Sequence, residues 1–309
     1  MIEFFQHLVN GLSVGTIYAL IALGYTMVYG VLKLINFAHG DIYMVGAFTG
    51  LYIAQMLDVD EHPSLAKAAI VFVGSMAVCG SLGVIIERFA YRPLRDRPRL
   101  TALITAIGVS FLLEYGFQLP PIGDGRIAFP PGPTPRFFPE PFPRVDFEPL
   151  GIHISNYDIV SLGVAVGLMF ALQFIVYRTK FGMAMRAVSF DANIAALMGI
   201  NVNRIIAWTF GLGSALAAAA ALLVAGSRPT INPLMGLMPG LKAFVAAVLG
   251  GIGNVPGAML GGLLLGLTEE YVSGYLISSY RDGIAFALLI LILLFRPAGL
   301  LGTMRPEKV

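Results

Sequence analysis

The sequence predicts an all-α protein, a polytopic integral membrane helical bundle. Of its 309 residues, 57% are hydrophobic and only 12% are charged, whereas a soluble domain carries about 45–50% apolar and about 25% charged residues. Its apolar stretches reach the roughly 20 residues that a helix needs to cross a bilayer. They show no train of the ten-residue alternating segments of an outer-membrane barrel. With a net charge of only +2, the composition excludes a cytosolic enzyme, a disordered chain and a nucleic-acid-binding protein.

Four apolar stretches fill the first part of the chain, and each predicts one helix. They cover residues 7–32, 42–57, 65–86 and 100–119. No cleavable leader pattern precedes them, so we expect the first to be an uncleaved span. A polar interruption at 33–41 separates the first two stretches, and a basic run at 88–99 follows the third.

Residues 120–150 differ in composition from the rest. They contain ten prolines: Pro120, Pro121, Pro130, Pro131, Pro133, Pro135, Pro139, Pro141, Pro143 and Pro149. Proline at this density forbids a helix. The segment is therefore predicted to be a solvated, extended loop.

The second half is predicted to hold three clear spans and one ambiguous stretch. The clear spans are residues 154–177, residues 205–225 and a last span that ends at Phe295. The ambiguous stretch, 241–267, is long but interrupted by a glycine-rich run at 250–257. The whole chain, 1–309, is therefore expected to form a single transmembrane domain of roughly 7–9 crossings, with room for one broken or re-entrant segment.

Loop charge predicts the orientation, because cytoplasmic loops carry an excess of lysine and arginine. Segments 88–99 and 178–204 and the C-terminal tail are basic, and we expect them to be cytoplasmic. Segments 58–67 and 120–150 are rich in acids, and we expect them outside, together with the N-terminus. Arg228 and Lys242 disagree, because they flank a loop that this scheme places outside.

Glycines recur four residues apart at five places, and small residues at this spacing let helices approach closely in lipid. The pairs are Gly11/Gly15, Gly46/Gly50, Gly163/Gly167, Gly257/Gly261 and Gly262/Gly266. The pattern favours tight packing within the membrane over a dimer interface at any single pair.

Catalytic and metal-binding motifs are missing from the sequence. The four histidines are scattered, Cys79 is the only cysteine, and there is no zinc-binding His-Glu-x-x-His, no Gly-x-Ser-x-Gly and no phosphate-binding Walker loop. We therefore expect a chain without enzymatic activity, metal site or cofactor of its own.

Polar residues at membrane depth are candidates for a substrate path, because a charge in lipid is costly. Glu114 lies within the fourth apolar stretch, either on a polar path or near the outer interface. Asn36, His39 and Asp41 lie in the turn between the first two stretches. That turn is either functional or a capped cytoplasmic turn in which Asp41 is the N-cap.

Segment 178–204 has the pattern of two short amphipathic helices. Phe181, Met185, Val188, Ala192 and Ala195 recur at spacings of four and three. Asp191 is expected to cap the second helix, and Gly199 to end it in a left-handed conformation. The apolar face needs a covering surface, either lipid or a cytoplasmic protein.

Several motifs make the whole sequence similar to the permease subunits of ABC importers for branched-chain amino acids, of the LivH type. The motifs are Gly15–Leu20, Tyr25–Gly30, Ile35–Asp41, Phe181-Gly182 with Arg186-Ala187, Ala195–Ile200 and Val248–Gly253. The Asn-Phe-Ala-His-Gly sequence within Ile35–Asp41 is the most specific.

The resemblance implies a prokaryotic cytoplasmic (inner) membrane location and a set of partners. These are a second, LivM-like permease subunit, two ATP-binding subunits that hold ATP and Mg, and a periplasmic or lipid-anchored substrate-binding protein. Membrane lipid surrounds the chain, and no nucleic acid is involved. The proline-rich loop is longer than expected for the family, and either contacts the binding protein or is an insertion.

The resemblance also implies that segment 178–204 couples the permease to the ATP-binding subunits. Its candidate residues are Phe181, Gly182, Met185, Arg186, Asn193, Ala195 and Gly199. The wider class carries Glu-Ala-Ala-x-x-x-Gly here. With the glycine at Gly199, Asn193 stands in place of the glutamate and Ile194 in place of the first alanine.

Two other functions fit the same sequence. One is a urea or short-amide permease of the same fold. The other is an ion-coupled secondary transporter, which should carry paired ionisable residues within the membrane. The substrate is not readable from this chain, because selectivity lies largely in the binding protein.

Overall fold

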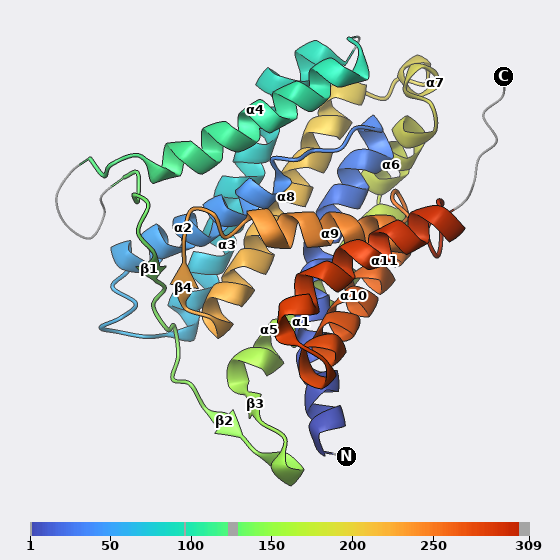
Figure 1. Ribbon diagram of the computed structural model, residues 1–309. Helices are drawn as coiled ribbons and strands as arrows, with labels where there is room; N and C mark the ends of the chain where they lie inside the picture. The colour runs from blue at the N-terminus through green and yellow to red at the C-terminus, as the bar shows by residue number, and fades with distance from the viewer. Residues whose placement is uncertain (1, 96, 123–128, 303–309) are drawn as a thin grey trace.

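The computed structural model describes residues 2–95, 97–122 and 129–302, and the described chain is mostly helical (Figure 1). The first half contains α1 (Ile2–Leu32), α2 (His39–Met56), α3 (Leu65–Ile86) and α4 (Arg99–Gln118). The π-helical turn η1 (Glu87–Tyr91) and the 3₁₀ turn η2 (Arg92–Leu94) extend α3. The second half contains α5 (Asn156–Arg178), α6 (Lys180–Phe190), α7 (Ala192–Leu197), α8 (Val202–Ser227), α9 (Leu237–Gly250), α10 (Val255–Tyr275) and α11 (Arg281–Phe295).

Six helices of the described chain are long and apolar enough to cross a membrane. They are α1, α3 with its extension, α4, α5, α8, and α11 with the preceding 3₁₀ turn η4 (Ser278–Tyr280). The 14-residue α9 is apolar but shorter. The prediction of a polytopic helical membrane bundle is confirmed.

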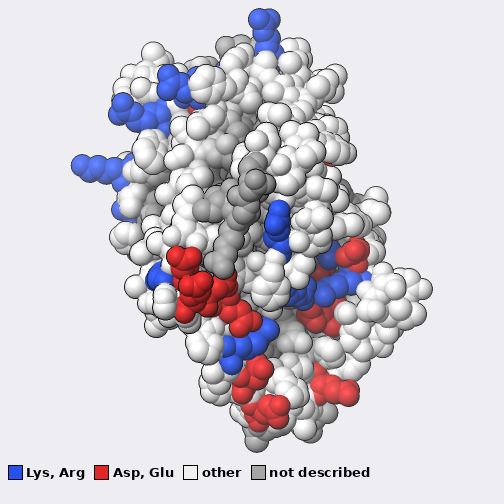
Figure 2. Space-filling view, turned by 90° about the vertical axis from the view of Figure 1, so that its left-hand side faces the viewer, with Lys and Arg blue, Asp and Glu red and all other residues white. Residues whose placement is uncertain are grey.

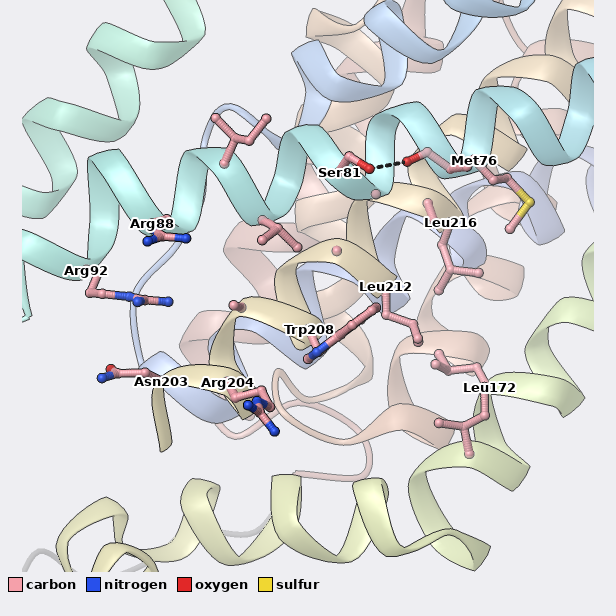
Figure 3. A pocket seen from close by; sticks show the side chains of 18 of the residues that line it. Met76, Ser81, Arg88, Arg92, Leu172, Asn203, Arg204, Trp208, Leu212 and Leu216 are labelled. Carbon is pink, nitrogen blue, oxygen red and sulfur yellow. Dashed lines mark hydrogen bonds between the residues drawn. The ribbon is translucent and has the colours of Figure 1, made fainter. Parts of the chain in front are cut away.

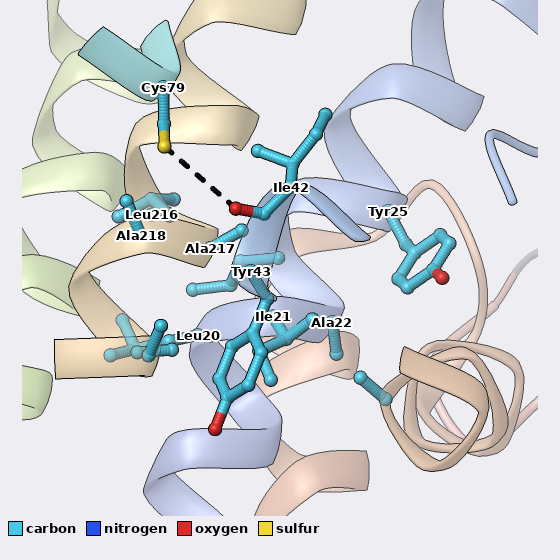
Figure 4. Packing of buried hydrophobic residues seen from close by; sticks show 14 of the residues in the cluster. Leu20, Ile21, Ala22, Tyr25, Ile42, Tyr43, Cys79, Leu216, Ala217 and Ala218 are labelled. Atoms are coloured by element: carbon cyan, nitrogen blue, oxygen red, sulfur yellow. Dashed lines mark hydrogen bonds between the residues drawn. The ribbon is translucent and has the colours of Figure 1, made fainter. Parts of the chain in front are cut away.

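Helices α1 and α8 lie at the centre of the bundle. Most of each is buried, whereas α3, α4, α5 and α11 expose most of their surface (Figure 1). The core is built where α1, α2, α3 and α8 meet, around Ile21, Tyr43 and Ala217 (Figure 4). Cys79 is fully buried there, and its thiol contacts the carbonyl oxygen of Ile42 at 3.8 Å. The exposed faces of the outer helices suit lipid or partner chains.

Two of the predicted glycine pairs pack α1 directly on α10. A Cβ built on Gly266 would lie 2.3 Å from the Cα of Gly15, and one on Gly11 would lie 2.9 Å from the Cα of Leu267. Even an alanine would therefore separate the two backbones. The Gly163/Gly167 pair on α5 behaves differently, because it has no neighbour within 4 Å among the described residues.

The predicted break in the stretch 241–267 separates α9 from α10. Gly251 and Gly253 have φ angles of +108° and +93°, which disfavour a side chain. The chain reverses so tightly that a Cβ on Gly250 would meet the carbonyl oxygen of Gly257 at 1.9 Å. The backbone amides of Leu300 and Leu301 bond to the last carbonyls of α9 and satisfy that helix end.

The described residues of the proline-rich segment form short strands, a 3₁₀ turn and loops rather than an α-helix, and they are not wholly solvated. Residues 123–128 of the predicted loop lie outside the described residues. Strand β1 (Arg136–Phe137) pairs antiparallel with β4 (Thr230–Ile231), which follows α8. Strand β2 (Asp146–Phe147) pairs with β3 (Ile154–Ser155), and the 3₁₀ turn η3 (Pro149–Gly151) lies between them. Phe138 is buried against the bundle. Apolar side chains between the prolines therefore fix this segment to the helices.

The two predicted sides of the membrane correspond to opposite ends of the molecule. The Arg95 guanidinium donates to the amide oxygen of Asn203 at 2.6 Å, which joins segments 88–99 and 178–204 at one end. At the other end, the Gln6 amide donates to the carbonyl of His153 at 2.9 Å. Figure 2 shows mostly lysine and arginine at the upper end and most of the visible acids lower down.

Candidate functional site

The turn between α1 and α2 holds a buried polar cluster. The hydroxyl of Tyr91 donates to the amide oxygen of Asn36 at 2.7 Å. The His39 ring packs edge-on against Tyr25, with centroids 4.6 Å apart, and its Nε2 has no hydrogen-bond partner among the described residues. Gly24 leaves room for the ring, since a Cβ there would lie 2.3 Å from that Nε2. Asn36 and His39 are thus structural neighbours deep in the bundle.

Asp41 and Glu114 form a second group, between α2 and α4. Ala38 is the N-cap of α2, so the interpretation of Asp41 as an N-cap is wrong. Asp41 instead lies within the first turn, and the hydroxyl of Ser110 donates to its carboxylate. Glu114 follows Ser110 by one turn of α4, is largely buried and interacts electrostatically with Asp41.

The sequence interpretation missed a network of buried charges. Glu269 on α10 is fully buried, and its carboxylate lies 3.0 Å from the Lys242 ammonium of α9 and 3.2 Å from the Arg281 guanidinium of α11. The hydroxyl of Tyr18 on α1 donates to the same carboxylate at 2.9 Å. Lys242 also pairs with Asp282 at 2.7 Å. Charged side chains therefore join three helices, α9, α10 and α11, and the neutral Tyr18 hydroxyl links α1 to them. Because Glu269 is fully buried, its charge needs these partners.

This network explains Lys242, one of the two charges that disagreed with the predicted orientation, but not Arg228. Lys242 lies inside α9 and is paired, so it is not a loop charge at all. Arg228 caps the end of α8 at the end of the molecule that holds the N-terminus. The signal that could have found the network was a single lysine within an apolar run that is followed by two adjacent acids, Glu269 and Glu270.

A cavity of about 640 Å³ opens beside the network. Its wall carries charges of both signs: Arg144, Asp158, Arg228, Lys242, Glu270, Arg281 and Asp282. Asn10, Ser13 and Tyr18 of α1 add neutral polar groups. None of the four predicted path residues, Asn36, His39, Asp41 and Glu114, lines this cavity. Among the described residues, no three His, Cys, Asp or Glu side chains are grouped as a metal site requires.

Segment 178–204 folds into the two predicted helices, α6 and α7. Asp191 caps α7 by accepting from the amides of Asn193 and Ile194 at 2.8 and 3.0 Å. Gly199, at φ +83°, ends it, and the amide of Ile200 bonds back to the carbonyl of Ala195. Both end signals are confirmed.

Most of the predicted apolar stripe of this segment is covered by the chain itself, although Ala192 is exposed. Met185, Val188 and Ala195 are buried, and α6 packs on α1, α5 and α8. Gly182 is equally enclosed, since a Cβ there would meet the Val176 carbonyl at 2.2 Å. The expectation that this face needs lipid or a partner protein is therefore wrong for Met185, Val188 and Ala195, which the chain itself buries. Phe181 is half-buried, while Arg186 is exposed and stacks on Tyr177 at 5.4 Å.

A different apolar surface is left open on α7. Ile194, Leu197 and Met198, which we call the α7 patch, are 55%, 86% and 78% exposed. Asn193 and Gly199 flank the patch and are exposed as well. Exposed apolar side chains of this size on one short helix are typical of an interaction surface.

These features define a multi-pass membrane protein with a polar, charge-lined cavity and an exposed apolar patch at the basic end. Residues 7–293 match the family model described as "Branched-chain amino acid transport system / permease component". The chain belongs to this family of transport permeases, as its sequence motifs predict.

Several relatives match it over nearly their whole length. The chain is 46% identical over 310 residues to the high-affinity branched-chain amino acid transport system permease protein BraD of Pseudomonas aeruginosa, covering 99% of this chain and 98% of that relative. It is 43% identical to the corresponding permease protein LivH of Escherichia coli, with the same coverage. A probable LivH of Methanocaldococcus jannaschii is 27% identical, over 92% of this chain and 88% of that relative.

Proposed function

We propose that the chain is a permease subunit of an ATP-driven importer that carries leucine, isoleucine and valine across the prokaryotic cytoplasmic (inner) membrane. The observation that carries this proposal is the identity of 46% and 43% to high-affinity branched-chain amino acid permeases over 99% of the chain. A binding protein on the outside delivers the amino acid. The chain itself performs no enzymatic step.

The proposed partners fit the two ends of the molecule. Two ATP-binding subunits hold ATP and Mg, and one of them docks on the α7 patch at the basic end. A second, LivM-like permease subunit covers part of the exposed outer helices. The binding protein docks at the opposite end, where segment 129–155 and the N-terminus lie together.

The charge-lined cavity is the proposed place where the amino acid enters this subunit. Its volume of about 640 Å³ falls within the roughly 300–1,000 Å³ of small-ligand sites. An amino acid carries an ammonium and a carboxylate, and a wall with charges of both signs can hold both. Arg228 is suited to the carboxylate, and Asp158 to the ammonium. A path role for Asn36, His39, Asp41 and Glu114 stays a prediction.

One observation bears on the rival transport class. Lys242, Glu269 and Arg281 are paired ionisable groups in the bundle, the feature expected of an ion-coupled secondary transporter. A coupling site, however, needs a carboxylate that can take up its ion. Glu269 already contacts two cations and a tyrosine hydroxyl. The network therefore fits a structural brace better than an ion site.

Uptake measurements test the proposal. The subunit is expressed with its genomic partners in a bacterium that lacks branched-chain uptake, and entry of labelled leucine is followed. We expect uptake to need an ATPase partner with intact catalytic residues and to continue when the proton and sodium gradients are collapsed at constant ATP. Gradient-driven uptake without any ATPase would overturn it. Strong competition by urea or acetamide, with none by isoleucine, would favour the short-amide permease.

A further inference from the structure

A long groove runs along the outside of the bundle, between α3 and α5. Both helices pack on α8, which forms the floor (Figure 3). The groove has a volume of about 1110 Å³, above the roughly 300–1,000 Å³ of most small-ligand sites. Its apolar walls are formed by Met76, Val84, Leu168, Leu172, Leu212 and Leu216. The hydroxyl of Ser81 donates to the carbonyl of Ala77 in its own helix, so a molecule bound in the groove need not accept a hydrogen bond from it.

One end of the groove is strongly basic. Arg88, Arg92 and Arg204 line it, and its described lining contains no acidic side chain (Figure 3). The nearby acid Glu87 is fully buried and is already paired with Arg92 and Arg95. Arg88 and Arg204 are exposed and make no ion pair among the described residues. This end of the groove therefore favours the binding of an anion.

The dimensions match one leaflet of a bilayer. From Arg88 to Met76 the groove follows the start of η1 and the end of α3 over twelve residues, which is about 18 Å at the helical rise of 1.5 Å per residue. Half of the hydrocarbon core is about 15 Å. Trp208 lies one turn beyond Arg204 on α8, is 60% exposed and faces the groove (Figure 3). Tryptophan is enriched at the level of the lipid headgroups.

We propose that this groove is a binding site for an anionic phospholipid. The phosphate lies between the guanidinium groups of Arg88 and Arg204, whose planar donors suit phosphate oxygens. The acyl chains lie along the apolar walls toward Met76. A free amino acid is a poor occupant, because the groove offers no carboxylate for its ammonium. Basic pockets between helices on the cytoplasmic side of a membrane are known to hold such headgroups.

Native mass spectrometry of the full-length chain, purified with its partner subunits in mild detergent, tests the site. The probe is phosphatidylglycerol added at known concentration. The double variant Arg88→Gln/Arg204→Gln is expected to retain it about 30-fold less tightly, given roughly 1 kcal/mol for each basic residue near an anionic surface. The matched control Arg178→Gln/Lys180→Gln removes two charges from the α5–α6 corner, outside the groove, and should change retention little.

A second variant tests the apolar part without touching a charge. Ala171 lines the groove from α5 and is exposed, so Ala171→Trp fills space without disturbing the core. It should also reduce retention of phosphatidylglycerol, but not of a soluble anion such as inorganic phosphate. Equal retention by the wild type and both groove variants would overturn the proposal. So would loss of the second permease subunit from the arginine variant, because the groove would then be a protein interface. Neither outcome bears on the transport function.

Discussion

At the scale of single residues, Glu269 is the best test of what holds the bundle together. Glu269→Gln removes the negative charge but keeps an acceptor for Tyr18, and so leaves Lys242 and Arg281 less compensated in a buried place. Breaking such a pair costs about 3–5 kcal/mol. We expect a clear fall in the melting temperature of the purified protein.

Asp282→Asn is the matched control for this change. It also removes one negative charge that pairs with Lys242. Because the Asp282 side chain is 52% exposed, solvent already screens this ion pair, and little stability is lost when it is removed. The melting temperature of this control should be close to that of the wild type. Equal destabilisation by the two variants would contradict the view that burial of Glu269 makes the network strong.

Single residues also show which structural roles can be predicted from the sequence. Asp191 and Gly199 were predicted correctly, because a helix cap depends on neighbours within a few residues. Lys242 and Glu269 were not, because they are 27 positions apart and meet only when α9 folds back on α10. One of the two interpretations of the turn, with Asp41 as a cap, is wrong, and the sequence does not reveal that Ser110 reaches Asp41 from α4.

At the scale of elements, α6 and α7 differ in how much of their apolar surface the chain itself covers. Met185 on α6 is only 6% exposed, whereas Leu197 in the α7 patch is 86% exposed. A charge at Met185 is buried without a partner and should reduce the amount of folded protein. A charge at Leu197 should leave folding intact.

The pair Met185→Asp and Leu197→Asp therefore separates the two roles. Leu197→Asp is expected to insert and melt like the wild type but to lose most of its ATP-binding subunits during co-purification. Met185→Asp should fail earlier, with a low yield of folded subunit in the membrane. Full retention of the ATPases and normal leucine uptake in Leu197→Asp would rule out the α7 patch as their docking surface.

The amphipathic pattern of this segment predicted its helices but not what covers them. The spacing of Met185 and Val188 gives one apolar face in any environment. Whether lipid, a partner or the chain itself covers that face depends on where α1, α5 and α8 lie. The open surface on α7 comes from Ile194 and Leu197 of a six-residue helix and from its C-cap, Met198, and so short a helix gives no periodic signal.

At the scale of the whole molecule, the predicted orientation can be tested with two engineered cysteines. Thr134 and Arg97 are both exposed and belong to segments predicted on opposite sides of the membrane. Arg95 is a poor site because it pairs with the buried Glu87. Thr134→Cys should react with an impermeant thiol reagent in intact cells, and Arg97→Cys only after permeabilisation. The buried Cys79 serves as the unreactive background. The reverse labelling pattern would invert the orientation.

The class of the whole molecule was predictable because it depends on composition and on the lengths of apolar stretches. The break between α9 and α10 was also visible, since glycines must stand where the backbone reverses. The cavity was not predictable. Its wall includes residues of α1, α5, α8, α9, α10 and α11. No local sequence pattern indicates which of these helices lie next to one another.

The pairing of β1 with β4 gives the molecule a mechanical linkage. Strand β1 belongs to the proline-rich segment, and β4 leads directly into α9, which carries Lys242. Residues 232–236 are all that separates β4 from α9, so a displacement of the proline-rich segment is expected to reach α9 through the paired strands. The segment and the Lys242–Glu269 contact are thus connected by two hydrogen-bonded strands and a short piece of chain.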